Sequence, residues 1–430
     1  MREQVAMKRV DLLSYKMATL SLGMLTAWML FVYALSYHPF ITESYLPVPI
    51  RIGIEGFVLY LLVMINIRYQ YLVDVIWFIP IIMIFGCVLL LEMDTFVKLI
   101  SSFNKLVLLI LAIGLLIRNR RVLNTCIKIW ILLSYFLCVA AILAFVGYNT
   151  GIIPFSPLDF GESINGVPGS YYYMHNAILG NLRSRQLLGL EFGRATGFMY
   201  EEIFFSFFLG FNILVARDWI DDPKKRKRFV RLNLITGITA FSTTFFLFFS
   251  LYFLVKKILG GKKMTIGVKT FAFLFLGVLS IGLILSSNYF GQTSASVRLD
   301  RMNMYFSIIE NSTWLTLLLG NGVGIAGVKL GIGFDSGWIA ILVERGVIML
   351  VFMVSLVVKC TKHNRWLMFY IFYFNFALDV FWYPLFLLLI AMSYACSNHK
   401  RKQSVVPSCL PGSPTTCVFS AYPETTVTSA

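Results

Sequence analysis

Charged residues are scarce in this chain. Asp, Glu, Lys and Arg make up 13% of the 430 residues, whereas hydrophobic residues make up 58%, and the mean hydropathy is +0.78. A water-soluble globule of this length has no means of burying so much apolar surface. The composition therefore excludes an ordinary soluble protein and leaves no room for a sizeable folded domain outside a bilayer. We expect an all-α protein, a polytopic helical bundle in a bacterial-type membrane.

Residues and motifs that could bind a metal ion or a nucleotide are also few. The chain has four histidines, and its seven cysteines form no CxxC pair and no metal-ligand spacing, so we interpret the cysteines as packing residues or free thiols. The sequence contains no P-loop and no nucleophile triad. We expect neither a metal ion nor a cofactor.

One glycine pattern formally matches a dinucleotide site. Gly322, Gly324 and Gly327 have the GxGxxG spacing, but no βαβ pattern surrounds them. A flexible loop near a ligand, or close helix packing through Gly320 and Gly324, explains these glycines better.

Apolar runs of membrane-spanning length recur along the chain. A helix needs about 20 residues to cross the hydrocarbon core. The clear candidates are residues 17–37, 52–67, 72–91, 99–117, 123–147, 197–215, 270–287 and 336–358. A cleaved secretory signal is the alternative for the first run, but that run is longer than a typical signal core and no clear cleavage site follows it. We therefore expect an uncleaved first span.

Lysine and arginine clusters predict which side each loop faces. The N-terminal leader and residues 118–121 and 224–228 are basic and should face the cytoplasm. Two apolar blocks, 232–255 and 367–396, carry basic residues on both flanks, so each is predicted to be a hairpin of two short helices. The breaks are expected near 236–244 and near Asp379. Counting both hairpins gives about twelve membrane segments and counting neither gives about ten, with both termini cytoplasmic.

This topology divides the chain into a membrane domain, residues 1–403, and a tail, residues 404–430. Two extracytoplasmic loop regions, about 148–195 and 288–335, interrupt the membrane domain. The tail is rich in Ser, Thr and Pro and is expected to be disordered. The formal charge of +16 comes from the cytoplasmic loops, where it attracts anionic membrane lipids. Nucleic-acid binding is not expected, because no soluble basic fold is present to carry it.

Arginines in the outside loops run against the usual charge asymmetry. They are Arg183, Arg185, Arg194, Arg298 and Arg301. A guanidinium held at the outer boundary of a membrane suits a lipid-linked pyrophosphate, because its fork matches phosphate oxygens where the dielectric is low. The alternative is that these arginines only pair with carboxylates such as Asp159, Glu162, Glu191 or Asp300, or extend to water.

Two carboxylates follow Arg194 at the outer end of a predicted spanning helix. Glu201 and Glu202 lie at a depth where charge is costly, which favours a functional role. Glu201 is a candidate general base and a candidate partner for orienting Arg194. Glu202 is as readily explained by a side chain that only reaches water.

Short motifs follow in a fixed order in the second half of the chain. They are RxxGxxxE at 194–201, Ser-Thr-Thr at 242–244, RxxR at 298–301, GNGVG at 320–324 and DSGWIAILVERG at 335–346. Together they resemble the O-antigen polymerase and ligase superfamily, which builds bacterial surface polysaccharides. Relatives often have Pro-Asn where this chain has Glu202-Ile203, and ligases tend to have a histidine near Asp335 or Ser336. The second difference favours a polymerase.

The resemblance implies a metal-independent glycosyltransferase in the bacterial inner membrane. Its substrate would be an undecaprenyl-pyrophosphate-linked oligosaccharide at the outer face, and a chain-length regulator and a flippase would be its partners. In this interpretation Arg194, Arg298 and Arg301 hold the pyrophosphate and stabilise the charge that develops as the glycosidic bond breaks. Glu201 or Asp335 removes the proton from the attacking sugar hydroxyl.

Two other functions remain open. A ligase-type transferase would move finished glycan to lipid A. A transporter or flippase of lipid-linked glycan would place paired charges near the bilayer midplane and often shows an inverted repeat. Glu55, Asp74 and Lys105 all fall near predicted helix ends, and no repeat is evident, so the sequence favours the polymerase.

Overall fold

The structure is a computed structural model. It describes residues 21, 23–35, 48–68, 93–152, 155–158, 172–175, 181–187, 190–197, 199, 202–259, 294–322, 325, 336–376, 378–381 and 383–405. Helices make up 85% of this part of the chain. The predicted tail, residues 404–430, lies outside it except for the last two residues of the final helix.

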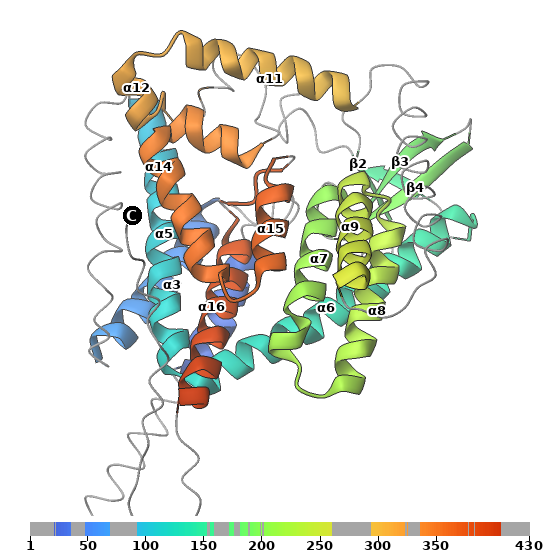
Figure 1. The fold of residues 1–430 in the computed structure, drawn as a ribbon, viewed down its shortest axis with the longest axis horizontal. Helices are drawn as coiled ribbons and strands as arrows, with labels where there is room; N and C mark the ends of the chain where they lie inside the picture. The colour runs from blue at the N-terminus through green and yellow to red at the C-terminus, as the bar shows by residue number, and fades with distance from the viewer. Residues whose placement is uncertain are drawn as a thin grey trace, which may run out of the picture.

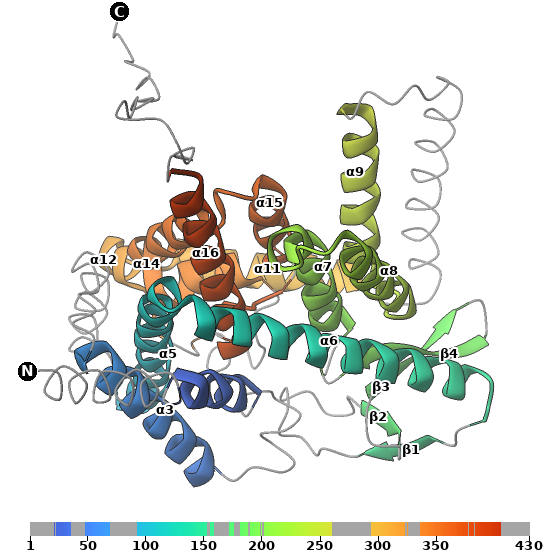
Figure 2. The same cartoon turned by 90° about the horizontal axis from the view of Figure 1, so that it is seen from below.

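The described elements are shown in Figure 1 and seen from below in Figure 2. The helices are α3 (Val48–Arg68), α5 (Met93–Arg118), α6 (Arg120–Asn149), α7 (Glu202–Trp219), α8 (Pro223–Thr239), α9 (Thr243–Leu259), α11 (Ser294–Glu310), α12 (Trp314–Leu319), α14 (Gly337–Thr361), α15 (Arg365–Phe374) and α16 (Pro384–Val405). The strands are β1 (Phe155–Leu158), β2 (Tyr172–His175), β3 (Asn181–Leu187) and β4 (Leu190–Gly197). A further apolar helix covers Gly23–Leu35.

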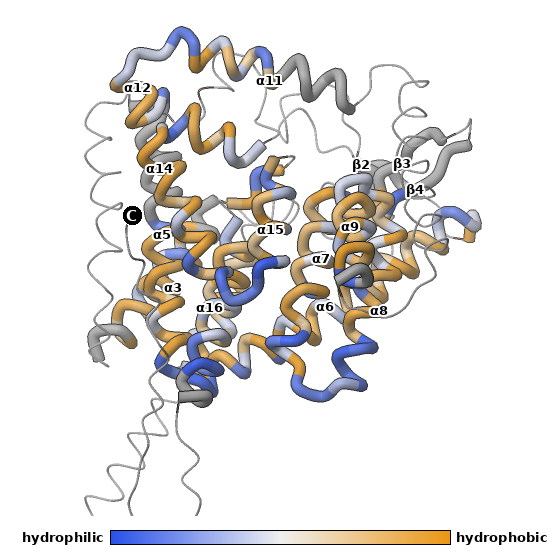
Figure 3. The backbone as a smooth tube through the Cα atoms, viewed as in Figure 1, coloured by the Kyte–Doolittle hydropathy of each residue, from blue (hydrophilic) through white to orange (hydrophobic). Residues whose placement is uncertain are grey.

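Among the described helices, two, α6 and α14, are long and apolar enough to cross a membrane. Helix α6 is apolar on all sides, since Trp130 is buried while Leu132 and Leu143 on the other face are 71% and 63% exposed. An outward leucine face suits lipid better than water. Figure 3 shows hydrophobic residues along most of α7 and α14 and hydrophilic residues gathered in the loops at the lower end, whereas the coloured part of α11 mixes the two.

A four-stranded antiparallel sheet, ordered β1-β2-β3-β4, occupies the first predicted outside loop. The prediction of an all-α chain is wrong for this segment, although the rest of the described chain is mostly helical. The loop contains no apolar run long enough for a helix, whereas β3 and β4 pair from Leu187↔Leu190 to Asn181↔Gly197 across a two-residue connection. Such a short connection is typical of a tight hairpin, and the sheet brings the chain back to α7.

Both predicted hairpin blocks contain a helix break where the sequence indicated one. Helix α8 ends at Thr239 and α9 begins at Thr243, and between them Phe241 has a φ of 47°. Helix α15 ends at Phe374 and α16 begins at Pro384, with Asp379 in the turn between them. The two breaks are confirmed. That each half crosses the bilayer stays a prediction.

Buried amides hold three helices of the bundle together. The Asn212 side chain on α7 accepts a 2.6 Å hydrogen bond from the Trp130 indole on α6 and donates to Asn233 on α8 at 2.9 Å and to Ser134 on α6 at 3.1 Å. In an apolar interior such polar groups must satisfy one another. This network fixes how α6, α7 and α8 pack.

Several helix ends meet at a face that we call the basic end. Lys400 near the end of α16 lies 3.4 Å from Asp218 on α7, and His399 lies 3.1 Å from the Leu116 carbonyl oxygen near the end of α5. The Asn364 amide, which precedes α15, donates to the Leu214 carbonyl on α7 at 3.0 Å. The basic clusters at 118–121 and 224–228 belong to this end. Strand β4 enters the opposite end of α7, which we call the sheet end.

Candidate functional site

Arg194 is positioned by strand β4. Its strand pairs with β3, placing Arg194 opposite Arg183, and is tied to the end of α6 at the preceding residue. There the Asn149 side chain donates to the Gly193 carbonyl at 3.1 Å and accepts from the Gly193 amide at 3.0 Å. These two bonds on one residue fix the strand against the helix, so the arginine leaves the sheet at a defined place.

The guanidinium of Arg194 forms an ion pair with Glu202, the first residue of α7. Its Nη1 atom lies 2.5 Å from Oε1 of the glutamate, and the two side chains are only 7% and 14% exposed. A carboxylate at a helix N-terminus is favoured by the free backbone N–H groups there. The sequence allowed that Glu202 only reaches water, and this is wrong, because Glu202 pairs with Arg194. The prediction that Glu201 orients Arg194 stays a prediction, since Glu201 lies outside the described residues.

Two buried oxygen atoms at this ion pair are placed to form hydrogen bonds with a ligand. Within the described chain, Oε2 of Glu202 and Oγ1 of Thr196 are buried without a hydrogen-bond partner. A buried polar atom left this way costs about 1–3 kcal/mol, and such atoms are uncommon outside functional positions. Together Arg194, Thr196 and Glu202 can bind a polar, negatively charged group that also offers a donor. We call these three residues the arginine site.

The structure describes two of the other four predicted site residues, and those two only by their backbone. Glu201 and Asp335 lie outside the described residues. Arg298 and Arg301 lie on α11, three positions apart and so on one helix face, but their side chains are outside the described part of the structure. Their joint role with Arg194 stays a prediction.

The two glycine motifs of the second half interlock. The Asn321 amide donates to the Val343 carbonyl oxygen at 2.9 Å, and the Gly322 amide donates to the Glu344 carbonyl at 3.1 Å. Gly320 and Gly346 have φ angles of 98° and 78°, and a Cβ on either would collide with a backbone carbonyl oxygen of the other segment. The prediction of close packing is confirmed for Gly320, and Gly324 lies outside the described residues. At Gly320 and Gly346 the missing side chain lets the two backbones approach each other.

These backbone contacts lie beside a break in α14, and two charged residues come just before the break. The helix loses its regular geometry at Gly346, where α14 changes direction in Figure 1. Just before the break, Arg345 pairs with the adjacent Glu344 at 3.1 Å, and their side chains are 7% and 12% exposed. A break in a buried helix exposes backbone groups that can contact a ligand or an ion.

Further charged groups approach Arg345 from other helices. Lys105 on α5 interacts electrostatically with Glu55, Arg345 and Asp379. Glu55 is 6% exposed on α3, and the Asp379 carboxylate accepts a hydrogen bond from the Phe381 amide. We call these five residues, Glu55, Lys105, Glu344, Arg345 and Asp379, the buried charge cluster.

The sequence interpretation missed this cluster. It placed Glu55 and Lys105 near helix ends, whereas the structure places Lys105 near the middle of α5 and close to Glu55 and Asp379. The missed signal was the Glu344-Arg345 pair inside an apolar run, because charge at such a depth is expensive without a purpose. Only the fold could show that helices so far apart in sequence bring their charges together.

The two groups of charges are linked through packed aromatic rings. Phe204, two residues after Glu202, contacts Tyr383, four residues after Asp379, with ring centroids 5.1 Å apart. The Gly337 amide at the start of α14 donates to the Leu378 carbonyl of the same turn. The starts of α7, α14 and α16 therefore meet around the turn that carries Asp379.

Comparisons with protein-family models, with curated proteins and with solved structures give no match for this chain. Among the described residues, no group of three or more His, Cys, Asp and Glu side chains could hold a metal ion. The described residues show two arrangements of charge: an arginine paired with a carboxylate at the arginine site, and the buried charge cluster beside the break in α14.

Proposed function

We propose that this protein is a multi-pass membrane enzyme of the inner membrane that polymerises surface polysaccharide. It would join oligosaccharide units carried on undecaprenyl pyrophosphate at the outer face, as the ordered motifs of the second half suggest. The observation that carries the proposal is the arginine site, where Arg194 is buried, paired with Glu202 and accompanied by unpartnered oxygen atoms.

The arrangement of charge along the bundle supports the outer location of this site. Basic loops are retained on the cytoplasmic side of a membrane, and the basic end contains the 118–121 and 224–228 clusters. Strand β4 joins α7 at the end opposite Arg217 and Asp218. If the basic end is cytoplasmic, Arg194 lies on the outer side.

The proposed reaction uses fixed charge rather than a metal. A hydroxyl oxygen of the acceptor sugar attacks the anomeric carbon of the donor, and the bond from that carbon to the pyrophosphate oxygen breaks with its electron pair. Arg194, joined by Arg298 and Arg301, stabilises the negative charge on the departing lipid pyrophosphate. Glu201 or Asp335 accepts the hydroxyl proton. Glu202 positions Arg194 and takes no part in the proton transfer.

The direct test is polymerisation by purified protein supplied with a defined lipid-linked oligosaccharide. Replacing Arg194 by Ala should abolish products longer than one unit, and Lys should restore little, because an ammonium group lacks the two-pronged fork. Lys225→Ala, an exposed basic-end residue, is the control and should keep normal product lengths. Normal ladders from Arg194→Ala would overturn the proposal.

A ligase is distinguished by what accumulates in cells without the protein. Loss of a polymerase leaves a single repeat unit on the final acceptor, whereas loss of a ligase leaves finished polymer on the carrier lipid. Analysis of lipid-linked and acceptor-linked glycans from a deletion strain separates the two.

A transporter of lipid-linked glycan is the second candidate, and the buried charge cluster favours it. Opposite charges inside a bundle, beside a broken helix, are typical of transport pathways. Replacing Lys105 by Met removes one cluster cation while keeping a similar length. If the protein is a transporter, Lys105→Met should abolish flux in vesicles and Arg194→Ala should leave it unchanged. Polymerisation that needs Arg194, without any flux, would exclude this candidate.

A further inference from the structure

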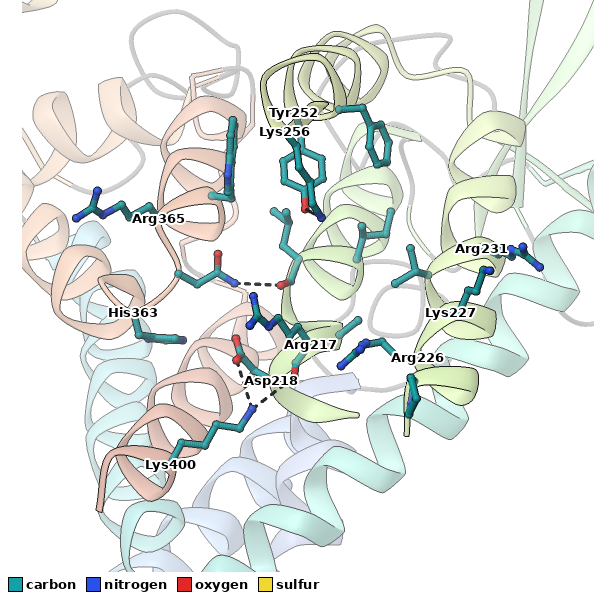
Figure 4. Close-up of a pocket in the computed structure, with 18 residues that line it drawn as sticks. Arg217, Asp218, Arg226, Lys227, Arg231, Tyr252, Lys256, His363, Arg365 and Lys400 are labelled. Atoms are coloured by element: carbon teal, nitrogen blue, oxygen red, sulfur yellow. Dashed lines mark hydrogen bonds and ion pairs between the residues drawn. The ribbon is translucent and has the colours of Figure 1, made fainter. Parts of the chain in front are cut away.

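A large cavity opens at the basic end, away from the arginine site. Its volume is about 1220 Å³, and it lies between α7, α8, α9, α15 and α16 (Figure 4). We call it the basic pocket. The polymerase mechanism gives it no role.

Positive charge dominates the lining of this pocket. Seven of its 18 lining residues are lysine or arginine, and Asp218 is the single acidic one. Asp218 is engaged by Lys400 at 3.4 Å. Burial lowers the pKa of the His363 imidazole below its ordinary value, and the nearby Asp218 partly offsets this effect. The excess of lysine and arginine over acidic residues gives the lining a net positive charge.

Cations from three helices converge on the same space. Figure 4 shows Arg217 of α7, Arg226 of α8 and Lys400 of α16 reaching toward one another. Arg217 and Arg226 form no ion pair with any residue that the structure describes. Like charges held close together repel one another, and a bound phosphate relieves that repulsion through charge-assisted hydrogen bonds.

The remaining wall of the pocket is apolar and aromatic. Leu214, Phe253 and Trp366 contribute to it, and the Trp366 ring meets the Tyr252 ring edge to face with centroids 4.9 Å apart. The Lys256 ammonium lies 5.2 Å from the centroid of the Tyr252 ring. Part of this wall reaches the outer surface, because the Phe253 side chain is 43% exposed. A ligand that fits both surfaces has an anionic head and a hydrocarbon body.

We propose that the basic pocket binds one anionic phospholipid, with its phosphate between Arg217 and Arg226 and an acyl chain along the Phe253 and Trp366 wall. The site differs from the general attraction of basic loops for acidic membranes, because it places particular guanidinium groups around one phosphate. It does not depend on the glycan chemistry at the opposite end.

The test titrates purified full-length protein in zwitterionic detergent with phosphatidylglycerol or phosphatidylcholine and counts bound lipid by native mass spectrometry. Phosphatidylglycerol should bind at one tight site, and phosphatidylcholine should bind at least about tenfold more weakly. The double variant Arg217→Gln/Arg226→Gln should weaken phosphatidylglycerol binding by about tenfold or more. Thermal unfolding of each variant without lipid checks that it is folded.

The matched control is Lys224→Gln/Lys225→Gln, which removes the same charge from exposed positions of α8 that do not line the pocket. It should bind phosphatidylglycerol like the unaltered protein.

Two outcomes would overturn the proposal. One is that both double variants lose the same amount of phosphatidylglycerol affinity, which would show only a diffuse attraction between basic residues and the lipid. The other is that the unaltered protein binds phosphatidylglycerol and phosphatidylcholine equally well. Competition by soluble pyrophosphate with no lipid binding would instead assign the pocket to a soluble phosphate. Should the pocket variant not fold, Arg226→Gln alone replaces it, with a smaller expected loss.

Discussion

At the scale of single residues, the Arg194–Glu202 pair joins the stability of the protein to its proposed activity. Both side chains are largely shielded from water, so their ion pair stabilises two charges that would otherwise be costly to bury. The sequence drew attention to Arg194, because an arginine in a predicted outside loop runs against the usual charge asymmetry. It did not predict the pairing with Glu202, since that contact depends on where β4 ends and α7 begins.

Replacing Glu202 by Gln should therefore lower stability and activity together. The change removes the negative charge that Glu202 places against the buried Arg194 guanidinium, and we expect a loss of about 3 kcal/mol in unfolding free energy. The double variant Arg194→Met/Glu202→Leu should regain most of that stability but remain inactive. Unfolding in detergent and polymerisation assays measure the two effects. Active double-variant protein would show that the pair is only structural.

Replacing Gly346 tests how a single residue supports the break in α14. Its φ of 78° and the close approach of the Leu318 carbonyl oxygen leave no room for the side-chain carbon of alanine. Gly346→Ala should cost at least about 1–3 kcal/mol of unfolding free energy, because it adds backbone strain to a clash. Gly56→Ala, where the added carbon meets nothing within 4 Å, is the control and should be neutral or slightly stabilising.

For the helices and strands, apolar runs and the positions of charged residues in the sequence predicted the helices better than the loops. The breaks in the blocks 232–255 and 367–396 were inferred from the basic residues on both sides, and the structure breaks its helices there. The sheet was missed because its strands are short and lie in a loop interpreted only through its arginines. Whether such short segments pair as strands depends on packing between their side chains, and the hydropathy of the sequence does not show that packing.

The amide network of Asn212 predicts how firmly α6, α7 and α8 are held. Asn212→Leu removes three side-chain hydrogen bonds and leaves the Trp130 indole nitrogen without its acceptor. We expect a loss of about 2 kcal/mol in unfolding free energy. Asn311→Ala, which removes one local hydrogen bond at an exposed position, should change stability by less than about 0.5 kcal/mol. Equal losses in the two variants would show that the network does not join the helices.

At the scale of the whole molecule, the chain has two ends of different character. One gathers basic loops around the basic pocket, and the other carries the sheet, the arginine site and the turn with Asp379. The sequence predicted this division from the positions of lysine and arginine. It did not predict the buried charge cluster, because α3, α5, α14 and the turn before α16 come together only in the folded chain.

The proposed function requires the sheet end with Arg194 to face outward and the basic end to face the cytoplasm. Single cysteines at Ile152, which is 75% exposed beyond α6, and at Lys224 report on the two ends when the native cysteines are replaced by serine. In intact spheroplasts an impermeant maleimide should label Ile152→Cys, and it should label Lys224→Cys only after the membrane is opened. Labelling of Lys224→Cys in sealed cells with protection of Ile152→Cys would place Arg194 in the cytoplasm and contradict the account.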